Sequence, residues 1–216
     1  MEQDLLKQIE STRLKFSRVV REYKKEHGSY IDTAPLLKQN HIEECKVFCS
    51  RLDMLSSGMF NGHGNWAEIG VDQANFSKEI MIRVNPARLH LIDIDTSRIV
   101  MNNIQNDVIS GRCIIHSGNS AEIISAFDDE YFDAIYIDGD HYYDGVKRDI
   151  NASMIKVKRG GFIIFNDYSA WSPGSMSKCG VMKAANEFIL KYDWSVVALS
   201  LQGAGYFDLA IKRPLI

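Results

Sequence analysis

From Trp66 onward, short apolar runs alternate along the chain with stretches that have the spacing of amphipathic helices. This alternation is typical of an α/β fold, in which each helix returns the chain so that the next strand adds to a mostly parallel sheet. The last two apolar runs are joined only by the segment QGAG, which predicts an antiparallel last strand. The strands are expected at residues 66–71, 88–94, 113–118, 132–138, 161–167, 194–201 and 206–213. The predicted fold is therefore a Rossmann-like, doubly wound, mostly parallel seven-stranded sheet.

Helical patterns fill the intervals between these strands and the first part of the chain. Within the sheet region they are expected at residues 74–84, 96–107, 120–127, 144–158 and 180–192. Residues 1–26 and 34–54 predict two more helices. The segment SSGMFNGHGNW then supplies turn formers, so we place a helical N-terminal extension at 1–60 and the Rossmann-like domain at 61–216. His63 in this segment either belongs to a plain turn or approaches a bound ligand. The extension is expected either to cover the site of the domain or to join copies of the chain as a homo-oligomer, and the sequence does not choose.

Composition excludes several classes of protein. A hydrophobic content of 45% in 216 residues is that of an ordinary globular chain with a proper core. The net charge of -3 argues against a non-specific nucleic-acid binder, which would show a basic excess. No apolar run approaches the length of a membrane span, and the first residues are charged rather than signal-like. The four cysteines lack the spacing of a disulfide framework, so we expect reduced thiols and a cytoplasmic protein.

The first predicted strand ends in EIGVDQANFS, where the chain turns into a helix. Gly70 allows a tight turn and a close approach of the backbone to a ligand. Asp72 and Ala74 stand where the glycine-rich fingerprint of nucleotide-binding folds has further glycines. The fingerprint is incomplete, so an ordinary strand–helix turn is the competing interpretation.

The next two strands end in polar residues that suit an adenine nucleoside. The segment LHLIDID places Asp93 at the end of the second strand and Asp95 two residues later, and an acid there can accept hydrogen bonds from ribose hydroxyls. The segment SGNSAEI places Asn119 and Ser120 in a turn after the third strand. Asn119 can reach an adenine edge there, or both residues can cap the following helix, and the two roles are compatible.

Acids and an amide also follow the fourth and fifth strands, in IDGDH and IIFNDY. Neighbouring parallel strands lie about 4.8 Å apart, so these two tips can converge on one point. Carboxylate and amide oxygens suit a hard cation such as Mg²⁺ or Mn²⁺. The alternative is that Asp140 or Asp144 only caps the next helix. The converging residues are Asp138, Asp140, Asn166 and Asp167.

Taken in order, these segments resemble a class I S-adenosylmethionine-dependent methyltransferase, and within that class the small group whose fourth strand ends in IDGDH. The resemblance covers residues 64–213, and its most specific part is 134–167. It implies metal-dependent O-methylation, as in enzymes that act on catechols or antibiotic sugars. It also implies a cofactor-binding set, which is Glu68, Gly70, Asp93, Asn119, Ser120 and Asp138. By the same resemblance the metal ligands are Asp138, Asn166 and Asp167, although the order ND replaces the DN of the catechol enzymes.

The expected reaction explains why each of these residue types is needed. An alcohol is a poor nucleophile until it loses its proton, and a divalent ion bound to neighbouring hydroxyls lowers their pKa. Asp140 is the expected general base, and His141 is a base, an outer partner of the metal or a residue at the helix entry. We therefore expect an S-adenosylmethionine-dependent O-methyltransferase that uses Mg²⁺ or Mn²⁺ on a small polyhydroxylated acceptor, such as a sugar or glycan-linked unit.

Three other functions compete with this interpretation. LHLIDIDTS resembles the motif of haloacid-dehalogenase-like phosphatases, with Asp93 as nucleophile and Asp95 as general acid, but a complete strand–helix unit precedes it and Ser97 replaces the usual Thr or Val. A nicotinamide-dependent oxidoreductase fits the fold but not the incomplete glycine loop. A nucleoside-binding module without catalysis leaves the acids of the fourth and fifth strands unexplained.

Overall fold

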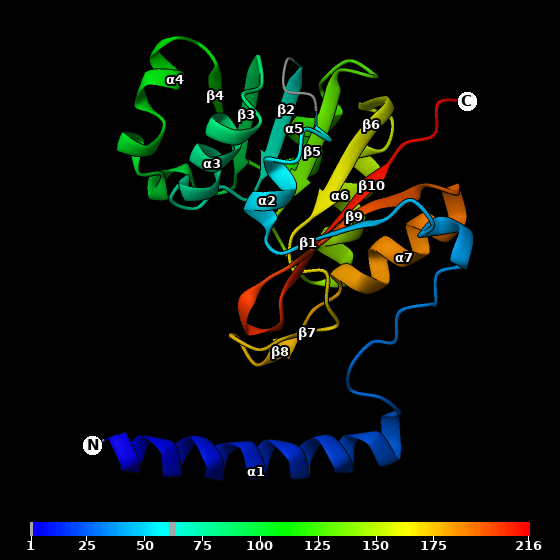
Figure 1. The fold of residues 1–216 in the computed structure, drawn as a ribbon. Helices are drawn as coiled ribbons and strands as arrows, with labels where there is room; N and C mark the ends of the chain where they lie inside the picture. Colours follow the sequence, from blue (N-terminus) through cyan, green and yellow to red (C-terminus); the bar gives the residue numbers. More distant parts are fainter. Residues whose placement is uncertain (1, 61–63) are drawn as a thin grey trace. The chain divides into compact units, whose positions relative to one another are not determined.

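The computed structural model describes residues 2–60 and 64–216, and His63 lies outside them. The chain divides into two compact units, Met1–Thr33 and Ala34–Ile216. The division falls well before residue 60, where the sequence analysis places the domain boundary. The larger unit contains the whole sheet and the helices that cover it (Figure 1).

An eight-stranded sheet forms the centre of the larger unit, with the strand order β1-β9-β10-β6-β5-β2-β3-β4 (Figure 1). All neighbours pair in parallel except β10, which is antiparallel to both β6 and β9. The predicted α/β Rossmann-like fold with an antiparallel last strand is thus confirmed. The strands are β1 Lys46–Phe48, β2 Asn65–Ile69, β3 Arg88–Asp93, β4 Cys113–Ser117, β5 Phe132–Ile137, β6 Val157–Phe165, β9 Ser195–Leu201 and β10 Phe207–Lys212.

The predicted count of seven strands and the predicted helix over 34–54 are both wrong, for one reason. Lys46–Phe48 forms β1, which pairs in parallel with β9 at the edge of the sheet. A three-residue strand has no periodicity of its own, and only its partner defines it. The helix in this region is limited to α2, Arg51–Leu55, whose N-cap Ser50 accepts a hydrogen bond from the backbone N–H of Asp53.

The remaining helices follow the predicted pattern with two corrections. Residues 96–107 are not one helix, because 3-10 turns at Thr96–Arg98 and Met101–Asn103 precede the short helix α4. The helix expected over 144–158 ends at Ser153, and the chain is already extended from Val157. The long polar loop after β6 contains a small hairpin of β7, Trp171–Ser172, and β8, Ser177–Lys178. The helices are α3 Asn75–Arg83, α4 Gln105–Ile109, α5 Ser120–Ser125, α6 Tyr143–Ser153 and α7 Val181–Tyr192.

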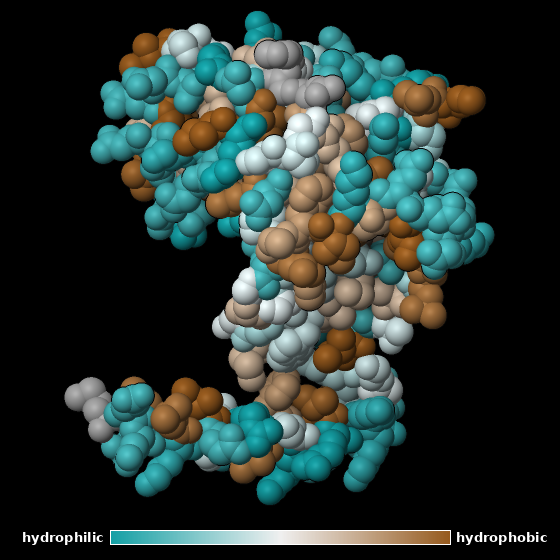
Figure 2. All heavy atoms as spheres, in the orientation of Figure 1, coloured by the Kyte–Doolittle hydropathy of each residue, from teal (hydrophilic) through white to brown (hydrophobic). Residues whose placement is uncertain are grey.

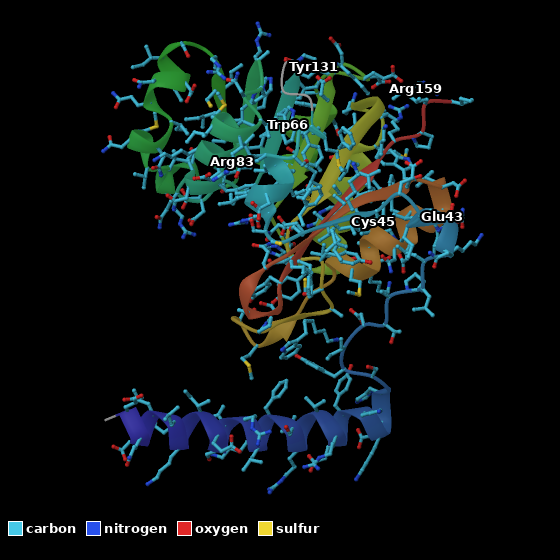
Figure 3. The ribbon with its side chains drawn as sticks, viewed as in Figure 1. Glu43, Cys45, Trp66, Arg83, Tyr131 and Arg159 are labelled. Atoms are coloured by element: carbon cyan, nitrogen blue, oxygen red, sulfur yellow. The ribbon has the colours of Figure 1, made fainter. Side chains whose placement is uncertain are left out.

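The sheet is buried on both faces, which explains its continuous apolar runs. Along β5, Ile135 and Ile137 pack into one core with α5, α6 and α7, whereas Ala134 and Tyr136 pack into a second core with α2 and α3. Helices on both faces make the fold doubly wound. The carboxyl ends of β2, β3, β4 and β5 therefore share one edge of the sheet, and α2 lies next to it (Figure 1). Trp66, labelled in Figure 3, lies near the amino-terminal end of β2 and so marks the opposite end of the strands.

The smaller unit consists of α1, Glu2–His27, and the segment that follows it. The helix buries none of its described residues, and Figure 2 shows its apolar side chains spread among charged ones. Tyr30 folds back onto the helix, with ring centroids 5.8 Å from Tyr23 and 6.0 Å from Phe16. Among the described residues, no helix combines the length and apolar character that a bilayer span requires.

Candidate active site

A pocket of about 730 Å³ runs along the carboxyl ends of β2 to β5. This is the edge at which doubly wound sheets bind ligands, and the volume is in the range of ligand sites. Asp140 lines the pocket, whereas His141, Asn166 and Asp167 do not. The structure also gathers the whole sequence-derived cofactor set there, which is Glu68, Gly70, Asp93, Asn119, Ser120 and Asp138.

The loop after β2 has the backbone path that its sequence only partly suggests. Gly70 has φ +85°, and a Cβ on it would overlap the backbone carbonyl of Asp138. Asp72 and Ala74 have φ of 47° and 59°. These are the left-handed conformations that glycine adopts most readily, at the two positions where the fingerprint has glycine. The loop therefore keeps the conformation of the fingerprint without its residues.

Asp93 holds this loop in place. Its Oδ2 accepts hydrogen bonds from the backbone N–H groups of Val71 at 2.7 Å and Asp72 at 3.1 Å. Its Oδ1 accepts a third, from Asp95 N–H at 2.9 Å. Asp95 does not line the pocket, and its carboxylate accepts hydrogen bonds from the backbone and hydroxyl of Ser97. Of the two acids, only Asp93 is placed to meet a ligand.

The turn before α5 contributes both a cap and a pocket wall. Asn119 is the N-cap, and its side chain accepts a hydrogen bond from the backbone N–H of Glu122 at 3.1 Å. Ser120 donates a hydrogen bond to Asp149 at 2.5 Å. The capping interpretation is thus confirmed for Asn119, and because both residues also line the pocket it does not conflict with ligand binding.

Glu68 is a buried acid on the floor of the pocket. It accepts a hydrogen bond from the hydroxyl of Ser77 on α3, with an oxygen–oxygen distance of 2.5 Å. Burial raises the pKa of Glu68 to about 8, although the Ser77 hydrogen bond and the charge of Arg51 act in the other direction. Glu68 is therefore mostly protonated at neutral pH.

The tips of β5 and β6 come together around the imidazole of His141. Its Nε2 lies 3.5 Å from Asp138 Oδ1, 3.3 Å from Asn166 Oδ1 and 3.9 Å from Asp167 Oδ2. Burial raises the pKa of Asp138 and of Asp167. Asp167 has φ +50°, a left-handed conformation that turns its side chain at the strand end. The predicted convergence of the two tips is observed for Asp138, Asn166 and Asp167, whereas Asp140 contacts Tyr142 and Arg148 instead.

The orientation of Asn166 follows from a buried network behind these tips. Its Nδ2 donates hydrogen bonds to Tyr136 Oη at 3.3 Å and to Asp208 Oδ1 at 3.2 Å. Tyr136 itself donates to Asp208 at 2.6 Å. With the amide nitrogen committed, the amide oxygen faces His141. Burial also raises the pKa of Asp208, to about 6.

The tip residues offer the donors of a hard-cation site but not a closed cage. Two carboxylates and an amide oxygen are the ligand types that Mg²⁺ or Mn²⁺ prefers. Within residues 2–60 and 64–216, however, no group of three or more His, Cys, Asp or Glu side chains has the arrangement of a metal site. The imidazole nitrogen stands among the three oxygens. The donor chemistry thus fits the cation, and His141 shares the space.

Asp140 has a structural role in addition to its place in the pocket. Its Oδ1 accepts a hydrogen bond from the backbone N–H of Tyr142 at 2.9 Å, at the start of α6. Its Oδ2 lies 3.8 Å from the guanidinium of Arg148. The alternative that Asp140 stabilises the helix start is therefore observed. Asp144 makes no such cap, because the N-cap position of α6 is occupied by Tyr142 without a side-chain hydrogen bond.

Sequence reasoning missed Arg51, Asp149 and Asp208. Arg51 lies on α2 and lines the pocket, with its guanidinium 4.3 Å from the ring centroid of Phe76. It belongs to a segment that the sequence assigns to a longer helix outside the domain, so nothing local signals its role. Asp149 is on the buried face of α6, and Asp208 lies in β10, where each reads as an isolated acid.

Comparison with known proteins finds one matching family model, one similar sequence and several similar folds. Residues 67–168 match the family model described as a methyltransferase domain. An uncharacterized protein of Acanthamoeba polyphaga mimivirus is 41% identical over 59 residues, which are 26% of this chain and 24% of that protein. The chain therefore spans about a quarter of the length of this relative.

Solved structures share the fold at low sequence identity. An O-methyltransferase from Bacillus cereus, solved with S-adenosylhomocysteine, has a TM-score of 0.58 and 16% identity over 91% of this chain and 97% of that one. The O-methyltransferase TomG from Streptomyces achromogenes has the same TM-score and identity over 76% of this chain and 79% of that one. Spermidine synthase from Thermotoga maritima has a TM-score of 0.59 and 14% identity, over 77% of this chain and 60% of that one. The match to a methyltransferase domain covers residues 67–168, just under half of the chain, and the solved structures share the fold around it.

Proposed function

We propose that the chain is an S-adenosylmethionine-dependent O-methyltransferase that acts on a small polyhydroxylated acceptor with the help of Mg²⁺ or Mn²⁺. One observation carries the proposal. Asp138 lines the pocket along β2 to β5 and also lies in the cluster of polar tips around His141. The pocket that suits the cofactor therefore opens next to groups that can activate a hydroxyl.

The pocket residues divide by what they can bind. Asp93 and Asn119 are proposed to contact the adenosine part, with Ile94 beside them as an exposed apolar surface for the base. Glu68, Gly70 and Asp138 are proposed to contact the amino-acid part. When bound, the cofactor supplies a methyl group on a sulfonium, which is a good leaving group. The protein has to hold the acceptor oxygen in line with that methyl group and to exclude water.

The tip cluster is proposed to activate the acceptor. Asp138, Asn166 and Asp167 would hold the divalent ion, which, when bound, lowers the pKa of an acceptor hydroxyl. Asp140 or His141 then accepts the proton. His141 lies closer to the proposed metal ligands, because its Nε2 is within 4 Å of one oxygen each of Asp138, Asn166 and Asp167. Asp140 lies closer to the proposed cofactor, because it lines the pocket.

Two of the competing functions account less well for the contacts of the site residues. A phosphatase nucleophile at Asp93 needs a carboxylate oxygen free for attack, but both oxygens accept backbone hydrogen bonds and Asp95 does not line the pocket. A module that binds a nucleoside without catalysis would not need the acids that converge beside the pocket. The sugar acceptor proposed for this chain rests on the IDGDH resemblance and not on the similar solved structures.

The proposal also includes the compartment in which the protein acts. All four cysteines, Cys45, Cys49, Cys113 and Cys179, are unpaired, which supports action in the reducing cytoplasm.

A screen of acceptors tests this function. The protein is incubated with labelled S-adenosylmethionine, Mg²⁺ and a panel of sugars, catechols, amines and carbon acids, and transfer is measured. Transfer to a hydroxyl that falls on chelation of the metal supports the proposal. Transfer only to nitrogen or carbon contradicts it, and transfer to oxygen that survives chelation removes the metal from it.

A further inference from the structure

The pocket is lined by many carboxyl groups and few cations. Its described acids come from β2, from α6 and from the segments at the ends of β2, β3 and β5, and they are Glu68, Asp72, Asp93, Asp138, Asp140 and Asp149. Two cations stand against them, Arg51 and Arg148. A cofactor that brings its own carboxylate into such a pocket meets repulsion unless a cation receives that group.

Arg51 is fixed at the end of the pocket where the acids of β2 and β5 lie. Its guanidinium packs against the face of Phe76, 4.3 Å from the ring centroid, a cation–π contact that holds the planar group in one orientation. Burial acts to lower the pKa of Arg51, but the neighbouring Tyr136, Asp208 and Asp138 raise it overall. A cation held in this way loses little further freedom when it binds an anion.

Arg148 is placed differently. It lies on α6, its side chain is 61% exposed, and its nearest acid is Asp140 at 3.8 Å. No aromatic ring among the described residues stacks on it. Arg148 is therefore free to turn into solvent, whereas Arg51 is part of the pocket wall.

The groups around Arg51 suit the two ionic groups of an amino acid. Asp138 and the mostly protonated Glu68 offer carboxyl oxygens to an ammonium group, and the guanidinium beside them can donate two parallel hydrogen bonds to a carboxylate. Adenosine contacts are expected at the other end, at Asp93 and Asn119. We infer that Arg51 binds the carboxylate of the amino-acid part of the cofactor, and so selects a cofactor that carries this group over one that lacks it. This inference rests on the proposed function.

Affinities measured for two ligands, in the wild type and in variants of Arg51, test this inference without any methyl transfer. The full chain is titrated by calorimetry with S-adenosylhomocysteine and with decarboxylated S-adenosylhomocysteine, which differ only in the carboxylate. The wild-type chain is expected to prefer the carboxylated ligand by about 10- to 100-fold, the worth of a charged, bidentate hydrogen bond. Arg51→Gln is expected to bring the two affinities within about threefold of each other. The matched control Arg148→Gln is expected to keep the wild-type ratio.

Arg51→Lys guards against a variant that does not fold, because it keeps the charge but loses the fork of two donors. Its ratio is expected to fall several-fold below that of the wild type. If Arg51→Gln or Arg51→Lys binds both ligands more weakly but with the wild-type ratio, the inference is overturned and Arg51 serves the fold of the pocket. A wild-type chain that binds both ligands equally well overturns the inference and leaves the proposed function standing. A chain that binds neither overturns both.

Discussion

Asp138 Oδ1 and His141 Nε2 lie 3.5 Å apart at the tip of β5, with Asn166 and Asp167 of the neighbouring strand tip against the same imidazole. The acids that end this strand are therefore not only helix caps. Asp140 supports the start of α6, whereas Asp138 faces both the pocket and the neighbouring tip. These contacts place the proposed sites of cofactor binding and hydroxyl activation side by side.

Asp138→Asn is expected to lower the rate of methyl transfer by about 100-fold or more, because the amide cannot replace the carboxylate toward a cation or a proton. Its affinity for S-adenosylhomocysteine is expected to stay within about tenfold of the wild type, since the raised pKa of Asp138 already makes a neutral side chain acceptable there. Steady-state rates and calorimetry measure the two effects. Asp144→Asn, which changes an exposed acid outside the pocket, is the control. An equal loss of rate and affinity would assign Asp138 to the fold or to the cofactor instead.

Gly70→Ala is expected to destabilise the protein by about 3 kcal/mol or more, since a Cβ there overlaps the Asp138 carbonyl and the left-handed backbone adds its own strain. Gly58 provides the matched control. It has a similar φ, +74°, with no atom near an added Cβ, so Gly58→Ala is expected to cost only about 1 kcal/mol. Denaturant unfolding of both variants measures the free energies. Equal losses would show that the strand contact at Gly70 relaxes and that only the backbone conformation matters.

His90 is expected to make the protein acid-sensitive. It is buried against Tyr131 and His116, with nitrogen contacts of 3.2 and 3.0 Å. Burial, and then the charges of His116 and Arg88, lower the pKa of His90 to about 4. The unfolded chain binds a proton near pH 6.5 and the folded chain does not, so stability falls as pH falls from about 6.5 to 4, by roughly 3 kcal/mol in all.

Denaturant unfolding at a series of pH values measures this loss, and His90→Gln supplies the comparison. The difference in unfolding free energy between wild type and variant is expected to shrink as the pH falls through this window. A difference that stays constant from pH 6.5 to 4 would show that His90 is protonated as easily in the folded chain as in the unfolded one.

Glu68 is expected to act in the opposite direction. Its pKa rises from 4.5 in the unfolded chain to about 8 on burial, so the folded state holds a proton that the unfolded state has lost. The stability that this proton contributes is complete below about pH 4.5 and is lost as pH rises to about 8. Glu68→Gln mimics the protonated acid. Its unfolding free energy relative to the wild type is therefore expected to rise by about 1 kcal/mol per pH unit between pH 5 and 8. A flat difference across this range would mean that Glu68 is ionised in the folded protein at neutral pH.

The sequence predicts much of this fold because the sheet is buried on both faces. Runs such as those of β3 and β5 are apolar along their whole length, and such runs are visible without a structure. Strand β1 is the opposite case. It is short, its residues are mostly exposed, and only its pairing with β9 makes it a strand. The end of α6 is a third case. The helical pattern of the sequence continues past Ser153 into residues that belong to β6 in the structure, so the sequence alone does not show where the helix ends.

The same distinction applies to the site. Gly70, Asp93 and Asp138 lie at the carboxyl ends of predicted strands, and Asn119 directly follows one. In a parallel sheet such positions share an edge. Arg51 and Asp208 reach the site through tertiary packing, from α2 between β1 and β2 and from the antiparallel strand β10. No spacing in the sequence connects them to the strand tips. Their role follows only from the contacts with Phe76 and Tyr136.

The central claim is that the pocket along β2 to β5 binds an S-adenosyl cofactor, and calorimetric titration with S-adenosylhomocysteine tests it most directly. The titration is run with and without Mg²⁺, and NAD serves as the control ligand. Saturable one-to-one binding of S-adenosylhomocysteine, with no binding of NAD, is the predicted result. The absence of S-adenosylhomocysteine binding in both conditions would contradict the account and return the acids of the β5 tip to the role of helix caps.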